Sequence, residues 1–237
     1  MKVVLQPALV LHTRAWRDTS LLVELFTRDH GRVAVVAKGA KRSGKRSGSG
    51  MSALLQPFTP ILCSWSGRSD LKNLTACESR LAAPRLVGKA LYCGLYLNEI
   101  LARLLQPEDA NEVLFTLYEQ VLQQLAQGAE LDLCLREFEY RLLIELGYGF
   151  ELDVDGESGE PIQSGEHYQF HPDYGLTRAA PAGHARASRY GGDDLLRWSA
   201  GEFDLPARRC AKRLMREALR QHLGDRPLKS RELFHVH

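Results

Sequence analysis

The sequence predicts an α+β protein in which a small N-terminal β-barrel precedes a larger α-helical domain. Up to about residue 80, short runs rich in β-branched and other apolar residues alternate with turn residues, which is typical of strands. From Pro84 onward, apolar residues recur at helical spacing instead. The chain of 237 residues is long enough for two such parts, and we expect domains at residues 1–80 and 81–237.

Five strands are expected before residue 80. Turn residues at 29–31 and 67–70 join the second strand to the third and the fourth to the fifth, which predicts two hairpins. Five short strands with a long excursion after the third suit a closed barrel of the oligonucleotide-binding (OB) kind, although an SH3-like barrel has the same periodicity. The expected strands are residues 8–12, 20–26, 31–38, 59–65 and 71–76.

Helical spacing predicts five helices after the barrel. The first three form a helical bundle, and Gly147 is expected to cap the third of them. Residues 151–191 are rich in Gly, Pro, Asp, Glu and His, which predicts an irregular insertion with at most a hairpin near residues 168–176. The expected helices are residues 87–105, 110–127, 131–146, 193–200 and 206–223.

The net charge of +2 hides an uneven distribution. Residues 1–80 carry 13 Lys and Arg against 5 Asp and Glu, residues 81–206 carry 9 against 21, and the last 31 residues carry 9 against 3. Between His30 and Ser69 there are seven cations and no acidic residue. A field of one sign over 40 residues attracts polyanions and therefore indicates a phosphate-bearing partner, with a solvated basic loop as the alternative.

Membrane insertion and export are not expected. No run of about 18 apolar residues occurs, and the N-terminus reaches Gln6 and Pro7 before a signal-peptide core could form. The five cysteines are scattered and fit neither a disulfide framework nor a metal motif, so we expect reduced, mostly buried thiols in a cytoplasmic protein.

A stretch that begins at Gly39 resembles a nucleotide-binding phosphate loop only in part. Arg46 stands where that motif needs a Ser or Thr hydroxyl for magnesium. Residues 47–50 are Ser and Gly, and they are expected not to open a helix whose N-terminus would face phosphates. Nucleotide hydrolysis is therefore not expected at this place.

Other candidates for chemistry are equally incomplete. Asp153, Asp155 and Glu157 are spaced like calcium ligands, but the glycine and the final glutamate of that loop are missing. His167 and His171 have helical ligand spacing in a segment rich in Gly and Pro. We interpret both groups as polar surface loops. No nucleophile with a His and Asp partner is recognisable, so the sequence predicts neither an enzyme nor a metal site.

A signal for nucleic-acid binding remains in the basic half of the chain. Aromatic residues accompany the cations there, and single-strand binders use this combination to stack bases and neutralise phosphates. Phe26 and Phe58 are expected to fill the barrel, whereas Trp16 has the better chance of exposure. The candidate DNA-binding residues are Arg14, Trp16, Arg17, Arg32, Lys38, Lys41, Arg42, Lys45 and Arg46.

Several motifs along the chain closely resemble the RecO family of bacterial recombination mediators. In the first half they are LHTRAWRDTSL at residues 11–21, VAKGA at 36–40 and LQPFTP at 55–60. In the second half they are GLYLNEI at 94–100, LGYG at 146–149 and PLKSRELF at 227–234. The resemblance covers nearly the whole chain.

This resemblance implies an OB-fold followed by a helical domain, and a protein that binds single- and double-stranded DNA and anneals complementary strands. It also implies cooperation with RecR in loading RecA onto DNA covered by single-stranded-DNA-binding protein, in the cytoplasm at the nucleoid. The acidic C-terminal tail of that binding protein is then an expected ligand of the helical domain. The candidate residues for the tail are Arg136, Arg209, Lys212 and Arg213.

Some alternatives stay open. The alternative for the tail candidates is that they pair with acidic residues of the middle segment. Many RecO relatives carry a four-cysteine zinc module in the insertion, but residues 151–191 contain no cysteine, and Asp155 and Ser158 lie near the expected place of the first pair. We therefore expect no zinc and no other cofactor. A nuclease or modifying enzyme that docks on nucleic acid, and an RNA-binding module, are the competing functions.

Overall fold

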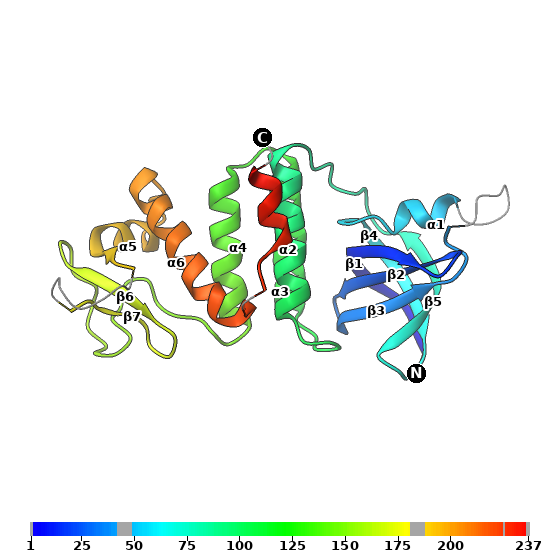
Figure 1. Ribbon diagram of the computed structural model, residues 1–237, viewed down its shortest axis with the longest axis horizontal. Coiled ribbons are helices and arrows are strands. Elements are labelled where there is room, and N and C mark those ends of the chain that lie inside the picture. The colour runs from blue at the N-terminus through cyan, green and yellow to red at the C-terminus, as the bar shows by residue number, and fades with distance from the viewer. Residues whose placement is uncertain (1, 42–48, 181–187, 225, 236–237) are drawn as a thin grey trace. The chain divides into compact units, whose positions relative to one another are not determined.

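A computed structural model gives the fold of the chain (Figure 1) and describes residues 2–41, 49–180, 188–224 and 226–235. The chain forms two compact units, of which the first contains Met1–Ala129 with Leu228–His237 and the second contains Glu130–Pro227. The barrel ends before residue 80, but the first unit continues into two helices. The division into domains after residue 80 stays a prediction.

The N-terminal strands form a closed barrel in the order β1-β2-β3-β5-β4. All neighbouring strands are antiparallel except β3 and β5, which run parallel and close the barrel. The short helix α1 (Ser49–Leu54) lies between β3 and β4. This arrangement is that of an OB-fold rather than an SH3-like barrel, and the predicted fold class is confirmed. The strands are β1 (Lys2–Trp16), β2 (Ser20–Thr27), β3 (Gly31–Ala37), β4 (Pro60–Ser66) and β5 (Leu71–Ser79).

Alternation along the strands builds the barrel core. In β3, Val33, Val35 and Ala37 are at most 2% exposed and belong to one apolar cluster inside the barrel. Trp65 of β4 fills the same cluster at 1% exposure. Because successive strand residues point to opposite sides, the residues between these positions face outward.

Two helices of the first unit pack on the barrel, α2 (Lys89–Leu104) and α3 (Glu112–Ala126). The buried Asn98 of α2 donates from Nδ2 to the Leu11 carbonyl oxygen at 2.6 Å and accepts from the Tyr118 hydroxyl of α3. These hydrogen bonds satisfy a buried amide and tie β1, α2 and α3 together.

Phe26 and Phe58 are buried as expected, but not inside the barrel. The Phe26 ring lies against Phe115 of α3, with ring centroids 5.5 Å apart. The Phe58 ring approaches Gly94 of α2 so closely that an added Cβ would lie 3.0 Å from it. Both rings therefore seal the contact between the barrel and the helices, and the prediction that they fill the barrel was wrong in this respect.

Two elements of the first unit differ from the expectation. A helix does begin at Ser49, because Met51 and Leu54 pack against the barrel core and this burial outweighs the weak helix propensity of Gly and Ser. The C-terminal helix η1 (Lys229–His235) has no counterpart among the expected helices. It is held on α2 by the Glu99 carboxylate, which accepts from the backbone N–H of Lys229 at 3.0 Å and of Ser230 at 2.8 Å.

The second unit combines three helices with a small sheet, and its predicted helices are confirmed to within one residue. Gly147, with φ of 81°, follows the end of α4 as the cap prediction required. Strand β6 lies between β7 and β8 in the sheet. The elements are α4 (Leu131–Glu145), β6 (His167–His171), β7 (Gly175–Arg178), β8 (Tyr190–Gly191), α5 (Gly192–Ser199) and α6 (Leu205–Leu223).

Asp155 in the insertion is only 6% exposed, so its interpretation as surface-loop polarity was wrong. Its carboxylate accepts hydrogen bonds from the backbone N–H of Glu157 and Ser158, each at 3.0 Å, and of Arg178 at 2.7 Å. Burial alone would raise the pKa of this carboxyl, but the backbone donors hold the pKa below its usual value. The carboxylate thus links the loop to β7.

The described residues also bear on metal binding and on membrane insertion. Within these residues, no group of three or more His, Cys, Asp or Glu side chains is placed to hold a metal ion. No helix in the described part of the chain is long and apolar enough to cross a membrane.

Candidate nucleic-acid interface

The outer face of the barrel is defined by the strand register. Arg14 lies opposite Leu22, Leu22 opposite Val36, and Val36 opposite Asn73, so these four residues form one row across β1, β2, β3 and β5. Since the neighbouring Val35 points into the barrel core, this row faces outward.

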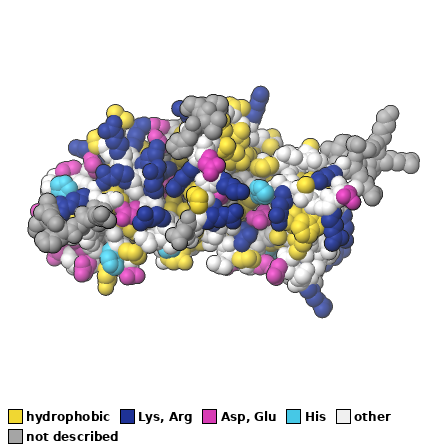
Figure 2. Space-filling view, viewed as in Figure 1, with side chains coloured by type: hydrophobic (Ala, Val, Ile, Leu, Met, Phe, Trp, Pro, Cys, Tyr) yellow, Lys and Arg dark blue, Asp and Glu magenta, His cyan; other side chains and the backbone are white. Residues whose placement is uncertain are grey.

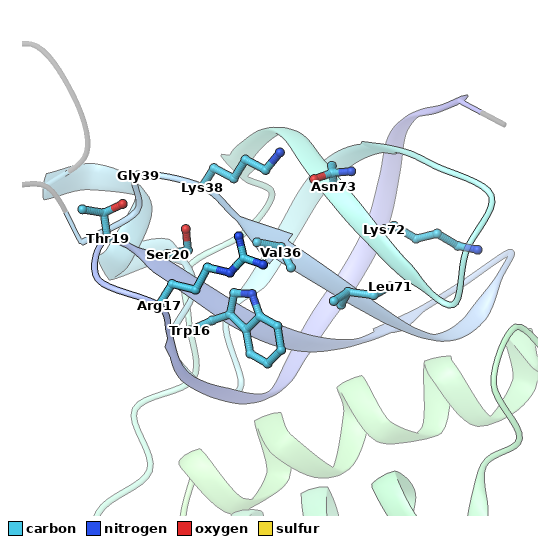
Figure 3. Close-up of a pocket in the computed structure, with 10 residues that line it drawn as sticks. All are labelled: Trp16, Arg17, Thr19, Ser20, Val36, Lys38, Gly39, Leu71, Lys72 and Asn73. Carbon is cyan, nitrogen blue, oxygen red and sulfur yellow. The ribbon is translucent and has the colours of Figure 1, made fainter.

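A cavity of about 590 Å³ opens on this outer face (Figure 3). Its apolar part comes from Trp16, Val36 and Leu71, and the polar side chains Lys38 and Asn73 lie on the same face. In Figure 3, the Arg17 guanidinium points across the strands above the Trp16 indole. The lining residues are Trp16, Arg17, Thr19, Ser20, Val36, Lys38, Gly39, Leu71, Lys72 and Asn73.

The described cations of the barrel fall into two groups: those without an acidic partner, which include the exposed Lys2 and Arg68, and those with one. Arg14, Arg17, Lys38 and Lys41 are exposed, and none of them forms an ion pair with an acidic side chain of the described residues. Because no carboxylate neutralises them, these four are available to an anionic ligand. Arg14 lies in β1, Arg17 directly follows β1, and Lys38 directly follows β3.

The second group is already paired. Arg28 Nε lies 2.9 Å from Asp29 Oδ1, and Arg80 pairs with Glu119. Lys72 is 4% exposed, and its Nζ lies 2.5 Å from Glu108 Oε1. These cations contribute to the charge count, but they have intramolecular carboxylate partners.

Arg32 differs from the other predicted DNA-binding residues. Its Nε donates to the Leu105 carbonyl oxygen at 3.1 Å, and its Nη1 lies 3.7 Å from Glu24 Oε2. With 21% of its side chain exposed, it belongs to the contact between β3 and the end of α2. The structure does not place it at the cavity.

Arg17 has a backbone φ of 53°, a left-handed conformation that is uncommon for residues other than glycine. Such a conformation costs of order 1–3 kcal/mol and is often found at functional sites. Two residues further along the same turn, the Thr19 carbonyl oxygen accepts a hydrogen bond from the Lys41 N–H at 3.0 Å. The turn that carries Arg17 is therefore bonded to Lys41. This lysine belongs to the basic tract, which we define as residues 38–46.

Among the remaining predicted DNA-binding residues, Arg42, Lys45 and Arg46 lie outside the described residues. Trp16 is half-buried and lines the cavity. Sequence reasoning missed Leu71 and Asn73, which reach the cavity only because β5 pairs with β3 across more than 30 residues of chain.

Comparison with known proteins identifies the family. A family model described as "Recombination protein O N terminal" matches residues 1–81, and one described as "Recombination protein O C terminal" matches residues 85–232. The chain belongs to the RecO family. It is 47% identical to the DNA repair protein RecO of Methylococcus capsulatus, over 98% of this chain and 93% of that protein. It is 44% identical to the DNA repair protein RecO of Alkalilimnicola ehrlichii, over 98% of this chain and 91% of that protein.

The helical part of this RecO-family chain presents a second cationic surface along α6. Its buried face is apolar, and on the face shown in Figure 2 many Lys and Arg side chains gather over this helix. The Asp204 side chain begins the helix by accepting from the Ala207 N–H at 3.0 Å. The exposed cations of α6 are Arg209, Lys212, Arg213, Arg216 and Arg220.

The four residues predicted to hold an acidic tail have different surroundings. Arg136 of α4 is 7% exposed, and its Nη2 lies 2.9 Å from Glu139 Oε1. Lys212 Nζ lies 3.9 Å from Asp132 Oδ1, and the Arg213 guanidinium lies over the Tyr190 ring at 5.1 Å. Arg209 is exposed and has no acidic partner among the described residues.

Proposed function

We propose that this chain is a recombination mediator that binds single- and double-stranded DNA and anneals complementary strands without a covalent step. The observation that carries the proposal is the group of four exposed, unpaired cations beside a cavity with an apolar wall on the outer face of an OB-fold. Cations bind the phosphates and an apolar wall accepts bases, which is the arrangement that binders of single strands use. Membership of the RecO family supports this reading.

The proposed mechanism is electrostatic. Two DNA strands repel each other through their phosphates, and a protein that neutralises phosphates on both allows complementary bases to meet. Lys38 and Lys41 lead directly into Arg42, Lys45 and Arg46, so the cations on the barrel and those of the tract are continuous along the chain. Each phosphate contact releases counterions and needs neither ATP nor a metal ion.

The family relationship also supports a proposed set of partners. We propose that the chain cooperates with RecR to load RecA onto DNA covered by single-stranded-DNA-binding protein, in the cytoplasm at the nucleoid. The exposed Arg209 and Lys212 offer first contacts for the acidic tail of that binding protein. Arg136 would have to exchange Glu139 for a carboxylate of the tail.

An annealing assay tests the proposal. Two complementary oligonucleotides that carry a fluorophore and a quencher are mixed with the purified protein at low salt, without ATP or added metal. We expect faster quenching than without protein, and strands of unchanged length on a denaturing gel. Shortened strands would favour a nuclease, and equal or better annealing of RNA would favour an RNA-binding module. Absence of any acceleration would refute the proposed function.

A further inference from the structure

We propose that the cavity on the outer face of the barrel is a subsite for one unstacked nucleobase of single-stranded DNA, with Trp16 as the stacking residue. This inference rests on the proposed function, because it assumes that DNA binds this face of the OB-fold. It goes further in assigning one cavity, one ring and one conformation of the ligand.

The outward side chains on this face of the barrel are unusually apolar. Outward positions of a barrel strand are usually polar, since they face water. Here Leu22 and Val36 face outward and are each only 8% exposed, and Leu71 and Trp16 lie partly buried on the same face. A continuous apolar strip that crosses β1, β2, β3 and β5 is therefore present where alternation predicts polar residues.

Polar and cationic side chains border this apolar strip. Arg14 and Asn73 stand at the two ends of the row that contains Leu22 and Val36, and Arg17 and Lys38 line the cavity. Among the residues that the structure describes, no acidic side chain lines the cavity. A ligand with a flat apolar face and adjoining phosphates matches this border, whereas an aliphatic ligand would leave the cations without a partner.

The size and the polar groups of the cavity also suit a nucleobase. A volume of about 590 Å³ lies within the range of roughly 300–1,000 Å³ that small-ligand sites occupy. The Asn73 side chain carries both a donor and an acceptor, so its amide can meet the edge of different bases. The Ser20 and Thr19 hydroxyls add further donors at the opposite side. These groups suit a nucleobase of any sequence.

The subsite has a consequence for strand choice. A base in a duplex is stacked on both faces, and it must be unstacked and unpaired before it can enter a cavity. The cavity therefore favours single strands, and it loses its ligand when the bound strand pairs with its complement.

Affinity measurements with Trp16→Ala test this assignment. We expect this variant to lose about 5- to 150-fold in affinity for a thymidine oligonucleotide, which corresponds to one stacked base. Its affinity for a duplex of equal length, and for a strand of abasic deoxyribose phosphates, should change less than about twofold, because neither offers an unstacked base. Trp16→Phe should recover most of the affinity. Tyr174→Ala, which removes another exposed aromatic ring, is the matched control and should bind like the unaltered protein.

A second measurement observes Trp16 directly in the unaltered protein. The chain has three tryptophans, of which Trp65 and Trp198 are 1% and 7% exposed. With 5-fluorotryptophan incorporated, ¹⁹F NMR should show one shifted resonance on addition of the single strand and none on addition of the duplex. The Trp16→Phe protein identifies that resonance by its absence.

Two results would overturn the subsite while leaving the proposed function intact. One is an equal loss of affinity for normal and abasic strands in Trp16→Ala. The other is a Trp16 resonance that does not move when a single strand binds. If the unaltered protein binds no DNA at low salt, the proposed function itself fails, and the two failures are therefore distinguishable.

Discussion

Removing four unpaired cations of the barrel should reduce the salt dependence of DNA binding by a calculable amount. The variant carries Ala at Arg14, Arg17, Lys38 and Lys41. These side chains are exposed and have no acidic partner among the described residues, so their loss should alter the free energy of unfolding by less than about 0.5 kcal/mol each. Any large change in DNA binding then results from lost contacts with DNA and not from a loss of folded protein.

The magnitude follows from counterion release. Each neutralised phosphate of a single strand contributes about −0.7 to the slope of log affinity against log salt. Four lost contacts should therefore flatten the slope by about 2.8 for single strands, and by about 3.6 for duplex at about −0.9 per phosphate. Raising the salt from 50 to 200 mM weakens binding of a single strand in both proteins. The factor by which affinity falls should be about 50 times smaller in the variant than in the unaltered protein.

Fluorescence anisotropy with a labelled thymidine oligonucleotide at four or more salt concentrations measures both slopes. Arg28→Ala is the matched control, because it removes an exposed barrel cation that Asp29 already neutralises at 2.9 Å. Its slope should equal that of the unaltered protein. The reasoning is refuted if the fourfold variant keeps the full slope, or if Arg28→Ala flattens the slope as much per residue.

Three further predictions concern other parts of the chain. Replacing Lys41, Arg42, Lys45 and Arg46 by Ala should flatten the single-strand slope by about 3, and an unchanged slope in the same anisotropy titration would exclude the tract. Arg136→Ala should weaken binding of an acidic tail peptide ending in an aromatic residue, and calorimetry that shows unaltered affinity would exclude Arg136 from that site. Asp155→Asn should lower the free energy of unfolding at pH 7 by about 2–4 kcal/mol in urea titrations, because an amide cannot accept from all three backbone donors. Since the pKa of native Asp155 lies below its ordinary value of 3.8, its contribution to stability is present above that ordinary value and is lost as the pH falls through the lowered pKa. Equal pH profiles of the two proteins would contradict this role.

Local signals in the sequence were sufficient for most elements of the fold. Helical spacing predicted α2 to α6 closely, since each helix buries one apolar stripe that is visible in its own residues. The first strand was underestimated. It extends from Lys2 to Trp16, but register shifts between Val3 and Gln6 and between Val10 and His12 interrupt the alternation by which a strand is recognised.

Elements that depend on distant contacts could not be predicted in this way. The helix α1 forms on Gly and Ser because its apolar end packs on the barrel, and η1 forms because Glu99 accepts from its first N–H groups. The segment around Asp155 has the composition of a surface loop. The burial of the Asp155 carboxylate is explained only by the hydrogen bonds that it accepts from the backbone N–H groups of residues 157, 158 and 178. Each of these features joins residues that are far apart in the chain or depends on the detailed path of the backbone.

The candidate site shows the same limit in its charges. Residues 1–80 contain 13 Lys and Arg, and the sequence does not show which of them have an acidic partner. The structure pairs Arg28, Arg32, Lys72 and Arg80 with carboxylates. Six further cations are exposed without an acidic partner among the described residues: Lys2, Arg14, Arg17, Lys38, Lys41 and Arg68. Only unpaired cations release counterions from DNA at full effect, so the count overstates the expected salt slope.

Strand annealing needs more than positive charge, and this explains why the apolar strip matters. A purely cationic face would bind the duplex at least as tightly as the single strand, since each duplex phosphate contributes about 0.9 to the slope against about 0.7 for a single strand. Such a protein would retain its own product. In the mechanism that we propose, a base held by Trp16 would add affinity for the single strand alone, and this affinity would disappear when the base pairs. The cations would then bring two strands together, while the loss of the stacked base would favour release of the duplex.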